Sequence, residues 1–181
     1  PVAWAAEGES MYCSSVRTGD WETCGAEALV VYVDRNYRTL PDRDRRGRAG
    51  QSMGGYGTLR IGRRRPDVFS GLDAMSRCCL EARLGPDSAA VAEARAITHP
   101  DQVPEADFLT KIVLAWAAAW SPDPNDPPLY LDLPWANGAR QPGVVAEWAA
   151  NAPLALMHQH VQELRRPAAL GGELPPKRLE R

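Results

Sequence analysis

The sequence lacks a dominant charge, a long apolar run and any internal repeat. Its 181 residues carry a formal net charge of −2 and an ordinary apolar share, which is unlike a disordered chain. A general nucleic-acid binder needs a cationic face to displace counterions, so the charge balance argues against that class. The longest apolar stretch, Ile112 to Trp120, is far too short to span a bilayer. We therefore expect one globular domain with no nucleic-acid or membrane partner.

Cysteine is scarce, and its spacing is wrong for a metal site. None of the four cysteines forms a Cys-x-x-Cys pair, and no histidine stands at zinc-like spacing, so we expect neither a metal nor a cofactor. A disulfide framework is not expected in a chain of this length. A bridge between the adjacent Cys78 and Cys79 would be strained, so plain thiols are the expectation.

The two ends of the sequence carry few signals. No signal peptide is recognisable, which favours a cytoplasmic location, but the chain begins at Pro1 rather than Met, so processing or trimming remains open. The last residues, Gly171 to Arg181, include two prolines and several charges. We expect this segment to form a loose tail.

A glycine-rich run, Arg48 to Gly57, stands out from the rest of the sequence. Its Gly50-Gln51-Ser52-Met53-Gly54 fits the Gly-x-Ser-x-Gly pattern of a nucleophile elbow, in which a strand turns sharply into a helix and exposes the serine hydroxyl. The flanking glycines leave room for strand and helix to approach. A phosphate loop is the alternative, but the Gly-Lys-Ser/Thr ending is absent and the glycines miss the dinucleotide spacing. The elbow is therefore the favoured interpretation.

The flanks of this run predict a strand, a turn, a helix and a second strand. Residues 46–50 would form the strand that enters the turn, although they are more polar than a strand buried on both faces usually is. A helix is predicted from Met53 to Arg65, ending before Pro66. A short buried strand is predicted over Phe69 to Met75. This order is the βαβ crossover of a parallel sheet.

Helical periodicity dominates the remaining sequence. An amphipathic helix laid on a sheet is predicted from Trp21 to Tyr37, with Asp20 as its N-cap. The proline-rich segment from Ser121 to Pro128 excludes regular structure and suits a lid, a substrate wall or a structural crossover. Further helices are predicted over 88–96, 106–120, 144–150 and 154–166, and a further strand over 168–170.

Several of these stretches resemble the putative-esterase branch of the α/β-hydrolases, which includes S-formylglutathione hydrolase (esterase D) and mycolyltransferase-like proteins. The similarity runs in order over residues 2–166, and residues 106–143 resemble a helical, proline-rich insertion that one subgroup carries. The resemblance implies one partial domain over residues 1–181, a three-layer α/β-hydrolase-like fold with a reduced, mostly parallel sheet. The matching stretches are 18–22, 32–40, 50–57, 65–69, 120–124 and 127–135.

By this resemblance Ser52 is the acyl-accepting nucleophile, and the backbone N–H of Met53 is one donor of the oxyanion hole. The implied activity is hydrolysis of a small acyl ester or thioester through an acyl-Ser52 intermediate, without a cofactor. A serine hydroxyl needs a histidine base and an acid that orients it, in the chain order serine, acid, histidine. The family's histidine would follow its acid, near where Glu173 stands, but no histidine follows His160. His160 is therefore the candidate base that the chain offers, out of the family's order.

The incomplete set of catalytic partners keeps a second hypothesis open. The chain resembles the middle of an esterase truncated at both ends, so it could be a non-catalytic remnant or interaction module that keeps the fold. Open sheet edges would then favour a homo-oligomer.

Two arginine runs, 43–48 and 63–65, are expected to be a solvated loop and a helix C-terminus. Nucleic-acid binding by the first run is a third hypothesis.

Overall fold

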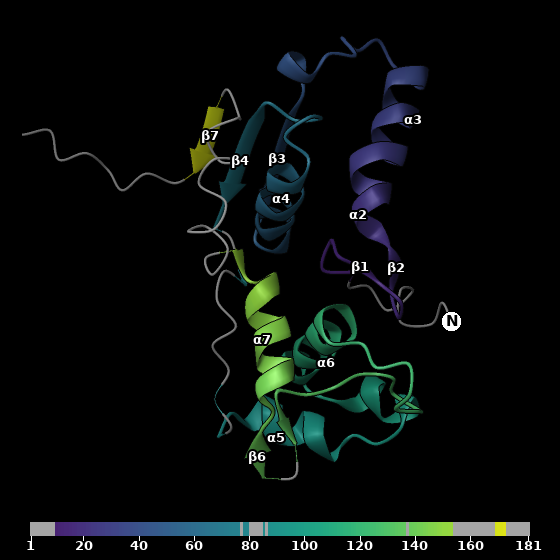
Figure 1. Ribbon diagram of the computed structural model, residues 1–181, viewed down its shortest axis with the longest axis vertical. Coiled ribbons are helices and arrows are strands. Elements are labelled where there is room, and N and C mark those ends of the chain that lie inside the picture. Colours follow the sequence, from purple (N-terminus) through teal and green to yellow (C-terminus); the bar gives the residue numbers. More distant parts are fainter. Residues whose placement is uncertain are drawn as a thin grey trace, which may run out of the picture.

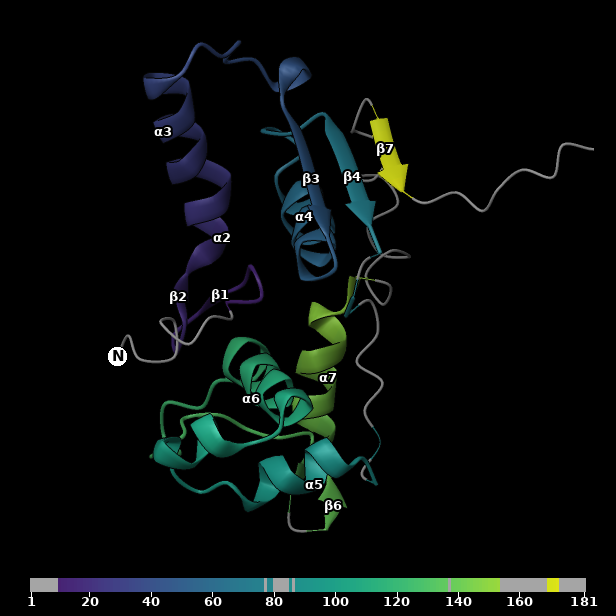
Figure 2. The same ribbon diagram turned by 180° about the vertical axis from the view of Figure 1, so that it is seen from behind.

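A computed structural model of the chain shows a small parallel sheet and a separate group of helices (Figures 1 and 2). The predicted helix over 154–166 lies outside the described part of the chain, as do His160 and Glu173. The structure describes residues 10–76, 78, 79, 85, 87–136, 138–153 and 169–172.

The central sheet has three parallel strands in the order β3-β4-β7. β3 spans Gly47–Gln51 and β4 spans Gly71–Met75, with Gly47 opposite Gly71 in the register. β7 spans Ala169–Gly172, so it confirms the predicted last strand but also takes in two residues that the sequence assigned to the tail.

Helix α4, Met53–Arg64, connects β3 to β4 and packs on the sheet, which confirms the predicted βαβ unit. Its buried Ile61 lies in a small apolar cluster with Leu72 of β4 and Phe69. A Cβ on Gly62 would collide with the Leu72 side chain, so this glycine lets the helix lie close to the strand. The helix ends before Pro66, as predicted.

The N-terminal part is a short antiparallel hairpin followed by a long helix beside the sheet. Asp20 caps this helix as predicted, because its carboxylate accepts a hydrogen bond from the Thr23 N–H at 3.3 Å. The helix stands beside the edge of β3 rather than flat on the sheet, and α3 buries none of its side chains. The elements are β1 (Ser14–Ser15), β2 (Gly19–Asp20), α2 (Trp21–Thr23), the π-helical η1 (Cys24–Ala28) and α3 (Leu29–Asn36).

The remaining described helices gather beyond the carboxyl ends of β3 and β4 (Figures 1 and 2). Their core is built on Trp116, Trp120 and Trp148, whose ring centroids lie 5.1 to 5.9 Å apart. The elements are α5 (Ala89–Ala96), η3 (Pro100–Glu105), α6 (Phe108–Trp120), the hairpin β5 (Trp135–Ala136) and β6 (Ala139–Arg140), and α7 (Pro142–Asn151).

The proline-rich segment is irregular, as predicted, and the core anchors its two ends. The Ser121 hydroxyl donates a hydrogen bond to the Asp132 carbonyl at 2.7 Å and accepts one from the Trp148 indole N–H at 2.8 Å. These bonds tie the segment to α7.

The described residues therefore form a small α/β domain with a parallel sheet. Within this part of the chain α4 is the helix that packs on the sheet, so the third layer of the expected arrangement stays a prediction. In the described part of the chain, no helix combines the length and the apolar character that crossing a membrane requires.

Candidate active site

Ser52 lies at the junction of β3 and α4, and its backbone is in a conformation that side-chain-bearing residues rarely adopt. Its φ is 53° and its ψ is −118°. Ser52 N–H donates to Met75 O at 3.1 Å, and Ser52 O accepts from Tyr56 N–H at 3.1 Å and Cys78 N–H at 3.2 Å. Strained backbone persists where the surroundings over-determine it, and these three hydrogen bonds do so. The strand, sharp turn and helix expected around Ser52 are all present.

The Ser52 side chain is exposed and does not cap the helix that follows it. A serine just before a helix usually caps it, but the Ser52 side chain makes no capping hydrogen bond to α4. The residue is also exposed at the carboxyl end of β3, where parallel α/β sheets place their ligands.

The backbone donors beside this hydroxyl come from the start of α4. Met53 is the first helical residue, and the first N–H groups of a helix have no acceptor within it. They also form the positive end of the helix dipole. The role of the Met53 N–H as a donor of the oxyanion hole remains a prediction.

The two glycines of the pattern play different steric roles. A Cβ on Gly50 would collide with the backbone carbonyl of Gly54, because strand and helix approach closely there. A Cβ on Gly54 would find its nearest neighbour, the Tyr12 hydroxyl oxygen, at 3.7 Å, which is ordinary contact. Gly57, further along the helix, lies directly against the Tyr12 ring. The close approach of strand and helix therefore depends on Gly50, and the packing of Tyr12 against α4 depends on Gly57.

The described residues bring no histidine to Ser52. His99, the one histidine among them, begins η3 with its side chain exposed. Its Nδ1 accepts a hydrogen bond from the Asp101 N–H at 3.3 Å and lies 3.2 Å from the Asp101 carboxylate, so its contacts stay in its own turn. The base assigned to His160 remains a prediction.

A family model described as "Putative esterase" matches residues 7–168. The chain belongs to this esterase family. A solved structure of a ferulic acid esterase is 21% identical, with the match covering 86% of this chain and 52% of that one at a TM-score of 0.36. The chain thus spans about half the length of that esterase. Among curated proteins, none matches the chain. Membership of the S-formylglutathione hydrolase branch stays a prediction.

A disulfide joins Cys78 and Cys79, so the expectation of plain thiols was wrong for this pair. Cys79 has a φ of 63°, in the left-handed region that side-chain-bearing residues rarely adopt. In the sequence, the adjacency of the two cysteines is the one feature that concerns their pairing, and it argued against a disulfide. In this esterase-family chain the pair follows directly after β4, next to Ser52.

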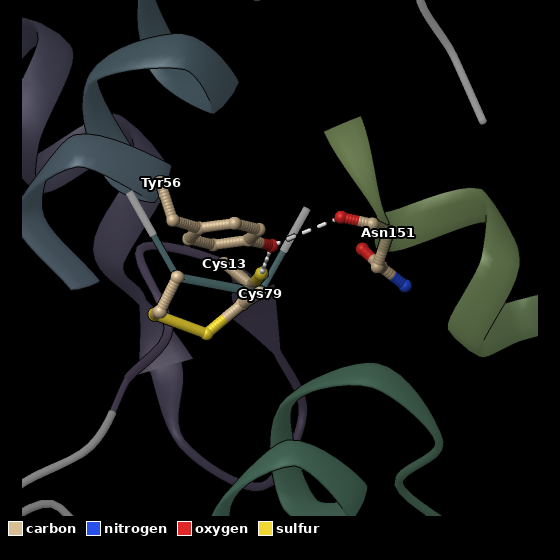
Figure 3. The surroundings of a disulfide bond; sticks show 5 residues. Cys13, Tyr56, Cys79 and Asn151 are labelled. Carbon is tan, nitrogen blue, oxygen red and sulfur yellow. Dashed lines mark hydrogen bonds between the residues drawn. A yellow bond between two sulfur atoms is a disulfide. The ribbon is translucent and has the colours of Figure 1, made fainter. Parts of the chain in front are cut away.

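The disulfide lies beside a buried polar cluster (Figure 3). The Tyr56 hydroxyl donates to the Asn151 carbonyl at 3.1 Å and lies 3.5 Å from the Cys13 sulfur. Burial raises the pKa of the Cys13 thiol and that of the Tyr56 phenol above their ordinary values, so both groups stay protonated. This cluster ties α4 to α7 and to the N-terminal segment.

The first arginine run is engaged in structural contacts rather than forming a free cationic face. Arg46 pairs with Asp34 at 2.7 Å. The Arg48 guanidinium lies over the rings of Tyr12 and Phe69, at 5.6 and 5.7 Å from their centroids. These contacts explain how so polar a segment forms β3, and they leave nucleic-acid binding without structural support.

A groove of about 680 Å³ separates α3 from β3. Apolar side chains of α3, including Val30 and Val33, face Ala49 and Phe69 across it. β3 is an edge strand of the described sheet, so the groove runs along its open side.

Within the described residues, no group of three His, Cys, Asp or Glu side chains could hold a metal ion.

Proposed function

We propose that the chain is a serine carboxylic-ester hydrolase acting on a small acyl ester or thioester. The observation that carries this proposal is the backbone of Ser52, at φ 53° and ψ −118° between a strand and a helix. The residue is exposed, and its side chain makes no capping hydrogen bond to α4. A strained turn from a strand into a helix supports the interpretation as a nucleophile elbow. Membership of the esterase family supports ester chemistry in general.

The proposed reaction proceeds through an acyl-Ser52 intermediate. The Ser52 oxygen attacks the ester carbonyl carbon while a base takes the hydroxyl proton, and the Met53 N–H stabilises the oxyanion that forms. The alcohol or thiol leaves with that proton, and water then releases the acid and restores the serine. We assign the base to His160, the last histidine of the chain, and assign no residue as the acid.

A serine-directed fluorophosphonate should label the folded protein at one site. Tandem mass spectrometry should place the adduct on Ser52, and urea-unfolded protein should stay unlabelled because nucleophilicity depends on the fold. His160→Gln should slow labelling about a hundred-fold or more if His160 is the base, since general base catalysis typically contributes that much. His99→Gln is the matched control and should label at the wild-type rate.

Two results would count against this proposal. Folded protein, verified by circular dichroism, that neither reacts with the phosphonate nor hydrolyses p-nitrophenyl acetate would reject the catalytic function. Normal labelling of His160→Gln would reject that residue as the base while leaving Ser52 in place.

A second candidate function is a non-catalytic module that associates with a second copy. The observation that favours it is the groove beside β3, next to exposed apolar side chains of α3 such as Leu29 and Tyr32. Edge strands expose unpaired backbone groups, which a β3 strand from a second copy would satisfy. This hypothesis expects an inert dimer in light scattering, whereas a monomer that turns over esters would contradict it.

A further inference from the structure

We propose that the Cys78–Cys79 disulfide is a redox site that controls the turn at Ser52. A dithiol reductant that opens the disulfide would loosen this turn. The consequence for ester hydrolysis rests on the proposed function, whereas the consequence for the backbone at Ser52 does not.

The disulfide belongs to the segment that holds Ser52. Met75 O accepts a hydrogen bond from the Ser52 N–H at 3.1 Å, and the Cys78 N–H donates one to Ser52 O at 3.2 Å. The segment from Met75 to Cys79 therefore binds both the N–H and the C=O of Ser52. Ser76 and Cys79, on either side of Cys78, have φ values of 39° and 63°. Such left-handed residues persist only when the surroundings hold them. The disulfide supplies a covalent constraint at this point.

The disulfide also packs against the first turns of α4. Cys78 and Cys79 are half-buried against the core cluster that contains Tyr56 and Cys13 (Figure 3). Tyr56 is fully buried and donates its backbone N–H to Ser52 O. The same helical turn is therefore fixed to Ser52 on one side and packed near the disulfide on the other.

Opening the disulfide changes the space that the two sulfur atoms need. Bonded sulfurs lie about 2.0 Å apart, whereas two thiols must separate to van der Waals contact, nearly twice that distance. Because the pair lies against a closely packed core, the segment has to move outward. That movement acts directly on the hydrogen bond between Cys78 N–H and Ser52 O.

The reaction balances with an external dithiol as the reductant. One thiolate of the dithiol attacks a disulfide sulfur to form a mixed disulfide, and its second thiolate displaces the protein sulfur. Cys78 and Cys79 gain two electrons and two protons, and the reductant leaves as a disulfide. The neighbouring Cys13 does not perform this attack, because burial raises the pKa of its thiol and only thiolates are nucleophilic.

The test compares the protein before and after treatment with dithiothreitol without denaturant. After the treatment, alkylation in denaturant followed by mass spectrometry should count two free thiols in the untreated protein, Cys13 and Cys24, and four in the reduced protein. Amide hydrogen exchange at Cys78 and over residues 52–56 should accelerate. Phosphonate labelling of Ser52 should slow about ten- to a hundred-fold, since small misplacements of reacting groups cost that much. Removal of the reductant with reoxidation should restore the rate.

Two variants serve as controls. The double variant Cys78→Ser/Cys79→Ser should show the fast exchange and slow labelling in both conditions. Cys24→Ser removes the exposed thiol outside the segment and should respond to dithiothreitol as the wild type does.

Each remaining result decides the proposal. A pair that stays closed in dithiothreitol, or a four-thiol protein with unchanged exchange at Cys78, overturns it. If the oxidised protein never reacts with the phosphonate, the proposed hydrolase function fails. The redox proposal is then tested by the rate of amide hydrogen exchange at Cys78 alone. Faster amide exchange at Cys78 with an unchanged rate of phosphonate labelling overturns the proposal that the disulfide controls the reactivity of Ser52.

Discussion

Replacing Ser52 by alanine is expected to abolish ester turnover and phosphonate labelling while leaving the protein folded. The substitution removes the proposed nucleophile, and loss of a catalytic serine lowers kcat by about a thousand-fold or more. The fold should tolerate it because the exposed hydroxyl makes no capping hydrogen bond to α4. We expect the free energy of unfolding to change by less than about 1 kcal/mol. p-Nitrophenyl acetate hydrolysis and urea denaturation measure the two effects.

Ser88→Ala is the matched control for this experiment. Ser88 also precedes a helix, α5, and also makes no capping hydrogen bond, but its φ of −64° and ψ of 128° are ordinary extended values. It should therefore retain wild-type turnover. Turnover by Ser52→Ala within tenfold of that control would contradict the assignment of Ser52.

Replacing Gly50 by alanine is expected to have the largest effect on stability. The new methyl group would collide with the backbone carbonyl of Gly54 and lie 2.9 Å from the Thr58 hydroxyl oxygen. Neither can move aside easily, since one is helix backbone and Thr58 is fully buried. Overpacking of this kind costs about 3 kcal/mol, a large share of the roughly 5–15 kcal/mol that stabilise a typical domain. We expect a large drop in the urea midpoint, or unfolded protein.

Gly54→Ala tests whether the effect is steric or general to glycine. Its methyl group would meet the Tyr12 hydroxyl oxygen at 3.7 Å, and alanine favours helix by about 1 kcal/mol over glycine. This variant should be as stable as the wild type or slightly more so. Equal destabilisation by the two substitutions would contradict the described approach of β3 and α4.

Most of the local structure around Ser52 could be predicted from sequence because its signals are short-range. Pro66 limits α4, and Asp20 caps the N-terminal helix through a hydrogen bond to a residue three positions on. β3 was the difficult element, since it carries Arg48 where an apolar residue was expected. It forms because Arg48 lies over Tyr12 and Phe69, contacts between distant residues that no local pattern contains.

In the candidate site, too, some features depend on neighbouring residues and others on contacts between distant segments. The Gly-x-Ser-x-Gly pattern, the apolar residues that flank it and Pro66 were enough to place Ser52 at a turn between a strand and a helix, because each of these acts within a few residues. The disulfide beside Ser52 and the unequal roles of Gly50 and Gly54 could come only from the folded chain. They depend on which backbones meet and on the sign of φ at Cys79, and both are set by packing between segments that the sequence keeps apart.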